Sequence, residues 1–262
     1  MILPPEILDK ILEHIPTHTG GRPTLIACAL VATWWTGPSQ RRLFSSVSIS
    51  EHNHWRWMNG VVRTESKARL LALVRSLSHR CGRDIGTKYP TRDLELDSGG
   101  YFSALPNVHS LTLRNLRVEH TSERQFRICF SAFRETLTYL SLEVIATSLG
   151  AFVTLVDYFP NITTLQLRSF VLEPDDGPVP PPSRPFQGKL YIGCFQDDRL
   201  EFFDRFAKLN LEYEELVIAP TALFTYEKRK LLEIALQIST STVKFLRLMT
   251  EIECEYSSPI HI

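Results

Sequence analysis

Hydrophobic residues near the start of the chain recur at helical spacing. The first apolar stripe keeps the i, i+3, i+4, i+7 pattern of one helix face and consists of Leu8, Ile11, Leu12 and Ile15. Pro4 and Pro5 suit the first turn of this helix, and Pro16 ends it. After a turn over residues 17–23, Thr24 is a suitable N-cap for a second helix. The pattern therefore predicts three short helices between residues 3 and 44.

The second of these helices is apolar on every side. The run from Leu25 to Ala32 contains no charged or strongly polar residue, and such a helix must be buried all round. A unit of about 40 residues is near the size below which chains seldom fold without help. The first and third helices cover roughly half of the second, so we expect another protein or domain to cover the rest.

Beyond residue 90 the chain repeats a β-like pattern of two leucines or isoleucines separated by one residue. The pairs are Leu94/Leu96, Leu111/Leu113, Leu140/Leu142, Leu165/Leu167, Leu190/Ile192, Leu216/Ile218 and Leu246/Leu248. Their first members follow one another at intervals of 17, 29, 25, 25, 26 and 30 residues. A period of this length is typical of leucine-rich-repeat solenoids. The position that usually carries asparagine holds Leu116, Ile145 and Phe170, so the repeats are degenerate.

Amphipathic helical stripes lie between these runs. They comprise Phe126/Cys129/Phe130/Phe133, Phe152/Leu155/Val156/Phe159, Leu200/Phe203/Phe206 and Leu231/Ile234/Ala235/Ile238, with Ser122 and Gln125 as a capping box. Alternating strands and helices predict an α/β fold in which parallel strands line one face and helices lie outside. An α/β sheet without solenoid geometry is the alternative.

Composition and charge narrow the class of function. Lys plus Arg and Asp plus Glu both number 29, so the net charge is zero and offers no broad attraction for nucleic acid or an anionic membrane. The five cysteines form no C-x-x-C pair, and the start of the chain lacks the basic and apolar regions of a signal peptide. We therefore expect a protein of the cytoplasm, the nucleus or both, with reduced thiols.

The residues that could carry chemistry favour no catalytic or metal site. His14 and His18 have ligand spacing, but Pro16 lies between them and ends the helix. The His52–Trp57 segment mixes imidazoles with indoles but has one arginine, so a packed linker is favoured over base stacking. No nucleophile elbow, phosphate-binding glycine loop or dinucleotide fingerprint is present. We expect neither an enzyme nor a cofactor.

The N-terminal segment resembles an F-box. Leu3-Pro4-Pro5-Glu6-Ile7-Leu8, Ile11-Leu12 and Ile15-Pro16 are similar to its opening, and Cys28-Ala29-Leu30-Val31, Trp35, Pro38 and Arg41-Arg42-Leu43-Phe44 are similar to its second half in many fungal F-box proteins. The Gly20-Gly21 turn is slightly long for the family. We expect an F-box over residues 1–45, a helical linker over 46–90 and a leucine-rich-repeat-like domain over 91–262. Within the linker, the segment from Arg63 to Leu77 is expected to be a helix that ends in an edge strand at Val74–Leu77.

The resemblance implies a function. F-box proteins connect a Skp-type adaptor, and through it a cullin-based ubiquitin ligase, to a protein substrate. The positions that match the family's adaptor-binding motif are Leu3, Pro4, Ile7, Leu8, Ile11, Leu12, Leu30, Val31 and Trp35. Some of these residues must instead hold the three helices together, and the pattern leaves that division open. A leucine-rich-repeat scaffold with no ligase role is the alternative function.

The repeat pattern also predicts where a protein substrate would bind. The leucines of each pair point into the core, and period 2 sends the intervening residues to the opposite, concave face. That face would carry Thr112, Arg114, Ser141, Glu143, Gln166, Arg168, Tyr191, Val217, Arg247 and Met249. Arginine and tyrosine are frequent binding anchors, which suits a protein or peptide partner.

Overall fold

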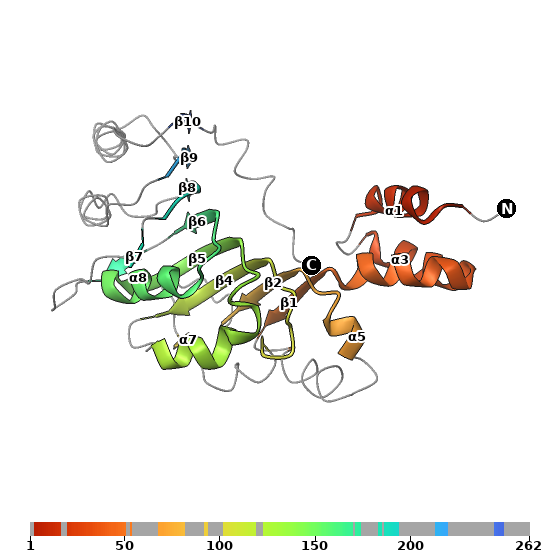
Figure 1. The fold of residues 1–262 in the computed structure, drawn as a ribbon, viewed down its shortest axis with the longest axis horizontal. Helices are drawn as coiled ribbons and strands as arrows, with labels where there is room; N and C mark the ends of the chain where they lie inside the picture. Colours follow the sequence, from red (N-terminus) through yellow and green to blue (C-terminus); the bar gives the residue numbers. More distant parts are fainter. Residues whose placement is uncertain are drawn as a thin grey trace.

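The computed structural model of the 262-residue chain is a mixed α/β structure in which N-terminal helices precede one parallel sheet (Figure 1). The structure describes residues 3–16, 20–50, 53, 68–81, 92–93, 102–118, 123–169, 171–173, 183–184, 186–193, 213–219 and 244–248. Among these residues no helix is long and apolar enough to cross a membrane.

Three helices form the N-terminal unit: α1 (Pro5–Glu13), α2 (Arg22–Val31) and α3 (Thr33–Phe44). Leu8, Leu12 and Leu25 form their buried core. The predicted N-cap at Thr24 is wrong, because α2 begins at Arg22 and has its cap at Gly21. Pro23 fits the first turn, where its missing N–H has no helical partner in any case.

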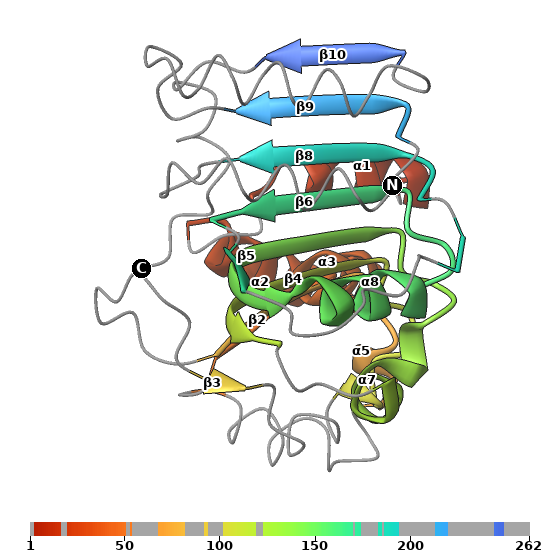
Figure 2. The ribbon, with the colours of Figure 1, turned by 90° about the vertical axis from the view of Figure 1, so that its left-hand side faces the viewer.

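The sheet contains ten strands, and every pair that it forms is parallel. Its main path runs in chain order through β1 (Ser46–Ser50), β2 (Ser76–Arg80), β4 (Ser110–Arg117), β5 (Tyr139–Ser148), β6 (Thr164–Arg168), β8 (Lys189–Gly193), β9 (Glu215–Ala219) and β10 (Phe245–Leu248). Figure 2 shows the later strands stacked one above the next, with their arrows in one direction. Six of the seven predicted leucine pairs lie on these strands.

One backbone contact repeats where successive strands begin. The carbonyl before β1, Ser45 O, accepts hydrogen bonds from the N–H groups of Arg75 (2.8 Å) and Ser76 (2.9 Å). The carbonyls of Arg75, His109, Thr138, Gly188 and Glu214 each accept two such bonds from the next strand in the same way. Residues 46–50 and 76–80 pair as parallel strands, so the helical-linker interpretation of residues 46–90 is wrong for β1 and β2. The edge strand expected at Val74–Leu77 overlaps only the first two residues of β2.

Two strands that precede β4 in the sequence pair with it, in the region where the sequence predicted a run at Leu94/Leu96. The short strand β3 (Arg92–Asp93) pairs with the far end of β4, at Leu116 and Arg117. The neighbour of Leu111 and Leu113 in the sheet is β2, through Leu77 and His79. Leu94 and Leu96 themselves lie outside the described residues.

Helices α7 (Glu123–Phe130) and α8 (Leu149–Tyr158) confirm two of the predicted stripes. Their apolar residues join the inward leucines of the strands in one buried cluster, to which Leu71 of the short helix α5 (Ala68–Leu71) also belongs. A 3₁₀ turn (Ser131–Phe133) continues α7 and buries Phe133. The stripes at 200–206 and 231–238 and the capping residue Ser122 lie outside the described residues.

A sharp corner follows the leucine pair of three successive strands. Asn115, Val144 and Ser169 each come two residues after the second leucine, and each has a positive φ of 47–55°. The next residues, Leu116 and Ile145, turn inward and are fully buried. Beyond the corner the backbone pairs again, because β7 (Val171–Glu173) joins the end of β5. The corner is thus anchored by apolar residues where asparagine is usual.

Replacing Val144 with asparagine should stabilise the fold. Val144 has a φ of 54°, and for a β-branched residue this left-handed conformation costs about 1–2 kcal/mol, whereas asparagine tolerates it. We expect Val144→Asn to raise the free energy of unfolding by about 1 kcal/mol in urea denaturation. Val144→Ala, which loses the branched side chain without gaining that tolerance, is the control, and a less stable asparagine variant would contradict the assignment of strain.

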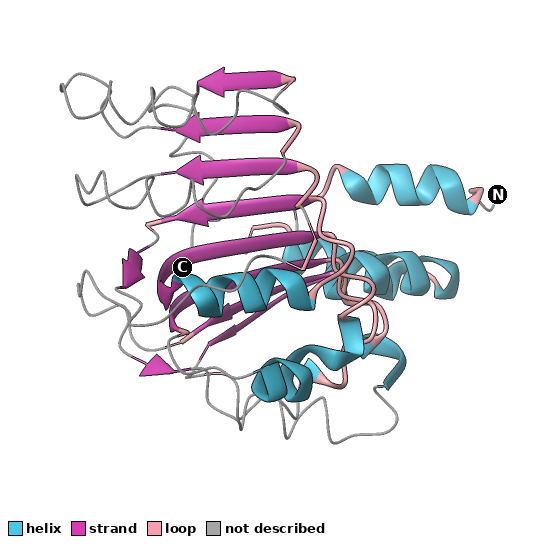
Figure 3. Cartoon of the chain, turned by 60° about the vertical axis from the view of Figure 1, so that its left-hand side comes forward, coloured by secondary structure: helices cyan, strands magenta, loops and turns pink. Residues whose placement is uncertain are grey.

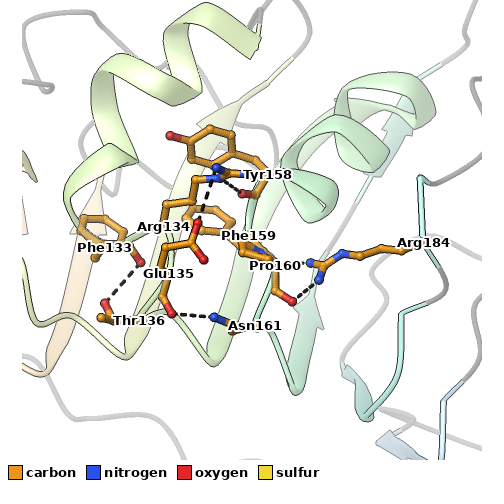
Figure 4. A network of polar contacts seen from close by, with 9 residues as sticks. All are labelled: Phe133, Arg134, Glu135, Thr136, Tyr158, Phe159, Pro160, Asn161 and Arg184. Carbon is orange, nitrogen blue, oxygen red and sulfur yellow. Dashed lines mark hydrogen bonds and ion pairs between the residues drawn. The ribbon is translucent and has the colours of Figure 1, made fainter.

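Polar side chains connect successive strand segments of the chain near the points where the strands begin. Asn107 Nδ2 donates to Ala72 O (2.8 Å), and Asn161 Nδ2 donates to Glu135 O (2.7 Å). Arg184 donates in the same manner to the carbonyls of Pro160 and Phe159 (Figure 4). Side chains at this end of the strands therefore satisfy backbone carbonyls 24–35 residues earlier in the chain.

Candidate functional site

The structure divides the predicted adaptor-binding residues into two groups. Leu8 and Leu12 are about 1% exposed and form the core of the helical unit with Leu25. Trp35 is half-buried and packs against this core, and Leu3 is also half-buried. Leu8 and Leu12 therefore hold the helices together and offer no surface to a partner.

The other group is exposed and apolar. Ile7 and Ile11 lie one turn apart on α1, and Leu30 and Val31 end α2 with 81% and 70% of their surface exposed. Ile26, one turn before Leu30, is also exposed, and sequence reasoning missed it because the apolar run gives no sign of which side is open. Pro4 is exposed as well. We call Ile7, Ile11, Ile26, Leu30 and Val31 the apolar helical surface.

Polar contacts fix the helices that carry this surface. Arg41 of α3 donates to both carboxylate oxygens of Asp9 on α1, at 3.0 and 3.1 Å. Thr36 Oγ1 donates to Ala29 O at 3.0 Å, which joins α3 to α2. A single nitrogen, Arg41 Nη2, makes both contacts, and as an exposed ion pair they contribute little stability while linking α1 to α3.

The helical unit is attached directly to the sheet. Ser45 alone separates the end of α3 from the start of β1, and its carbonyl is the acceptor that begins the repeating backbone contacts. A second link runs from Arg69 on α5 to Gln40 on α3 at 3.2 Å. Figure 3 shows these helices beyond the edge where the strands begin.

The predicted substrate-binding residues share one face of the sheet. Register places them in two rows across the strands. The first row contains Ser78, Thr112, Ser141, Gln166, Tyr191, Val217 and Arg247. The second row contains Arg80, Arg114, Glu143, Arg168 and Gly193. We call this the polar sheet face, because the alternating leucines on the other side are buried in the core.

Not every predicted residue on this face is accessible. Ser141 and Val217 occupy the expected positions but are about 1% and 2% exposed, so both lie beneath their neighbours and cannot contact a partner. The backbone of Arg247 pairs with that of Val217, but the structure does not describe the Arg247 side chain. Met249 lies outside the described residues.

A polar network joins β4, β5 and β6 on the polar sheet face. Arg114 Nε lies 2.6 Å from Glu143 Oε2, and both side chains are mostly buried, at 13% and 17% exposure. The Gln166 amide donates to Tyr139 Oη and accepts from Arg168 Nε (2.6 Å) in the orientation that satisfies both neighbours. Burial raises the pKa of Tyr139 above its usual value, so its hydroxyl stays protonated at neutral pH.

Sequence reasoning missed other residues of the same face. Ser78 and Arg80 were missed because β2 was not predicted as a regular strand. Tyr139, Lys189 and Glu215 lie one position before the first leucine or isoleucine of their pairs, on the same side as the residues between each pair. Lys189 and Glu215 form an ion pair at 2.8 Å. Period 2 extended by one residue in each run identifies these three.

The described residues form no metal site, and their buried cysteine is not a reactive nucleophile. No group of three His, Cys, Asp or Glu side chains among them is arranged to hold a metal ion. Burial raises the pKa of the Cys129 thiol to about 11, so it is protonated at neutral pH and is a poor nucleophile. The two surfaces are therefore the features of the described structure that can support a function.

No protein-family model matches the chain, and no curated protein matches its sequence. We therefore infer function from the residues of the apolar helical surface and the polar sheet face.

Proposed function

We propose that the chain is the substrate-recognition subunit of a cullin-type ubiquitin ligase, in which α1–α3 are an F-box that binds a Skp-type adaptor. One observation carries this proposal: the apolar helical surface is exposed on a unit whose core is already complete. Five of the seven large exposed hydrophobic side chains among the described residues lie on α1 and α2.

The energetics favour a protein partner for this surface. Complete burial of a valine, leucine or isoleucine side chain is worth about 1.5–3 kcal/mol, so a partner that covers these five side chains would gain considerable binding free energy. Leu8, Leu12 and Leu25 are already covered by the three helices, so refolding within the unit offers no further burial. The partner that the F-box resemblance implies is a Skp-type adaptor.

The sheet supports the second half of the proposal, a leucine-rich-repeat-like solenoid that presents a substrate. The strands of its main path follow chain order, and the same two-bond backbone contact precedes β2, β4, β5, β6, β9 and β10, as expected of stacked repeats. Such repeats leave their strand face open to partners while the helices cover the other side. Bond chemistry would reside in the partner proteins, and the proposal places this chain in the cytoplasm, the nucleus or both.

A leucine-rich-repeat scaffold without a ligase role is the second candidate. The polar sheet face favours it equally well, since that face would bind a protein in either case. The two candidates differ at the apolar helical surface, because a scaffold has no use for a Skp-type adaptor. An assay of adaptor binding therefore separates them.

The test is coexpression of the full chain with a recombinant Skp-type adaptor, followed by size-exclusion chromatography. We expect the chain alone to be poorly soluble and the pair to co-elute as a 1:1 complex that then recruits a cullin. A monodisperse monomer that does not shift when the adaptor is added would contradict the ligase role and favour the scaffold.

A further inference from the structure

The second row of the polar sheet face concentrates positive charge. Arg80, Arg114, Glu143 and Arg168 lie on adjacent strands β2, β4, β5 and β6 and are direct partners in register. Three guanidinium groups therefore share this row with a single carboxylate among its described residues. The whole chain has zero net charge, so the excess is local to this face.

Burial strengthens the effect of these charges. Arg114 and Glu143 are mostly buried, and Arg80 and Arg168 are half-buried, so water screens them less than it screens exposed groups. Glu143 neutralises one guanidinium through its contact with Arg114. The formal charges of the row's own four charged side chains sum to +2, and these side chains are partly desolvated.

The row has the length of a short peptide segment. Four parallel strands about 4.8 Å apart span about 14 Å between the outer two. An extended polypeptide rises about 3.3 Å per residue, so a segment of about four or five residues covers this distance. The adjoining row supplies neutral hydrogen-bonding side chains, including those of Ser78, Thr112 and Tyr191.

We propose that this row binds an acidic segment of the substrate polypeptide, laid across β2 to β6, with carboxylates or phosphates on the arginines. Arginine suits such groups because its planar guanidinium donates two parallel hydrogen bonds to them. Gln166 accepts from Arg168 and so orients its guanidinium in advance, which lowers the entropic cost of binding. This inference rests on the proposed function, since it specifies the substrate class of the same face.

The neighbouring charges favour a polypeptide over a nucleic acid. The acidic side chains Glu143 and Glu215 lie on the same face as the arginines and would repel a continuous phosphate backbone. Lys189 is paired with Glu215 and extends no basic track beyond the arginine row. A short acidic segment meets the arginines without crossing that pair.

The test measures peptide binding by fluorescence polarisation to the full chain purified with its adaptor. The probes are eight-residue Gly/Ser peptides whose four central residues are Asp, Glu, phosphoserine, Asn or Lys. We expect the acidic probes to bind at least tenfold more tightly than the Asn probe and to weaken as salt rises. Comparison of the Asp, Glu and phosphoserine probes shows whether carboxylate or phosphate is preferred.

Two variants with opposite expected effects keep the test decisive. The double variant Arg80→Gln, Arg168→Gln should weaken acidic-peptide binding at least tenfold, and Glu143→Gln should strengthen it, because the row's carboxylate is removed while Arg114 keeps a hydrogen-bond acceptor. Arg114 is left intact, since its loss would strand the buried Glu143 charge. Arg127→Gln, at an exposed position of α7, is the matched control and should leave peptide binding unchanged.

The outcomes distinguish this inference from the proposed function. Equal binding of acidic and Asn probes, or no change in both variants, overturns the acidic-segment inference even where the adaptor co-elutes. Tighter binding of a single-stranded oligonucleotide than of any peptide also overturns it. If the chain fails to bind the adaptor, it can be purified alone from a solubility-tagged fusion. Binding of acidic peptides by that preparation would support the acidic-segment inference and contradict the ligase role.

Discussion

Leu30→Asp is expected to abolish capture of a Skp-type adaptor while leaving the chain folded. Leu30 is the most exposed of the large hydrophobic side chains that the structure describes, so a carboxylate there costs the isolated chain almost nothing. In a complex the same carboxylate would be buried without a partner, at a cost of at least about 3 kcal/mol, or more than a hundredfold in Kd. Isothermal titration calorimetry with the adaptor measures the loss.

Two controls make this result interpretable. Thr24→Asp places the same charge on the exposed first turn of α2, where it should leave adaptor affinity unchanged. Leu12→Asp places it in the buried core and should unfold the helical unit, which circular dichroism would detect. An unchanged affinity for Leu30→Asp would show that α2 does not form the adaptor interface.

The second large effect is expected from Phe130→Ala in the core of the sheet domain. Phe130 is fully buried, and its ring lies 5.4 Å from that of Phe102, 5.7 Å from Phe159 and 5.8 Å from Phe133, measured between centroids. Truncation removes these contacts and leaves a cavity, at a cost of about 3–5 kcal/mol. Since domains are stable by only about 5–15 kcal/mol, urea denaturation should show a large fall in midpoint.

The matched control for this substitution is Phe245→Ala on β10. Phe245 has 68% of its surface exposed, so the same truncation there should change the free energy of unfolding by less than about 0.5 kcal/mol. Equal costs at the two positions would contradict the assignment of Phe130 to the centre of the core.

The periodic part of the fold could be predicted from sequence, whereas β1 was not predicted and β2 was predicted only at its first two residues, as the end of an edge strand at Val74–Leu77. Leucine pairs from Leu111 onward identify the strands, because two leucines separated by one residue share a single face of an extended chain and recur here at a regular interval. β1 instead carries Val47 and Ile49, and β2 carries Leu77 and His79. His79 fills a leucine position and is buried against the ring of Phe102, so the strand pattern was hidden by an imidazole in the core.

Whether an apolar residue of α1 is buried or exposed depends on its angular position around the helix axis rather than on its hydrophobicity. Ile7 and Leu8 are neighbours of similar size, yet a rotation of about 100° per residue turns one outward and the other into the core. The stripe predicted from spacing was wide enough to include both. Their roles are set by where α3 lies, because Trp35 and Leu43 of α3 pack against the core that contains Leu8.

The one-residue junction at Ser45 connects the helical unit to the sheet without a flexible linker. With a flexible linker, a bound substrate would occupy many positions relative to the helical unit. The effective concentration of the substrate at a distant reaction centre would then fall as the linker became longer. Here α3 passes into β1 through a residue whose carbonyl is held by two backbone N–H groups. In the proposed complex, the reach to an acceptor lysine would therefore be set by the substrate's own chain beyond the bound segment.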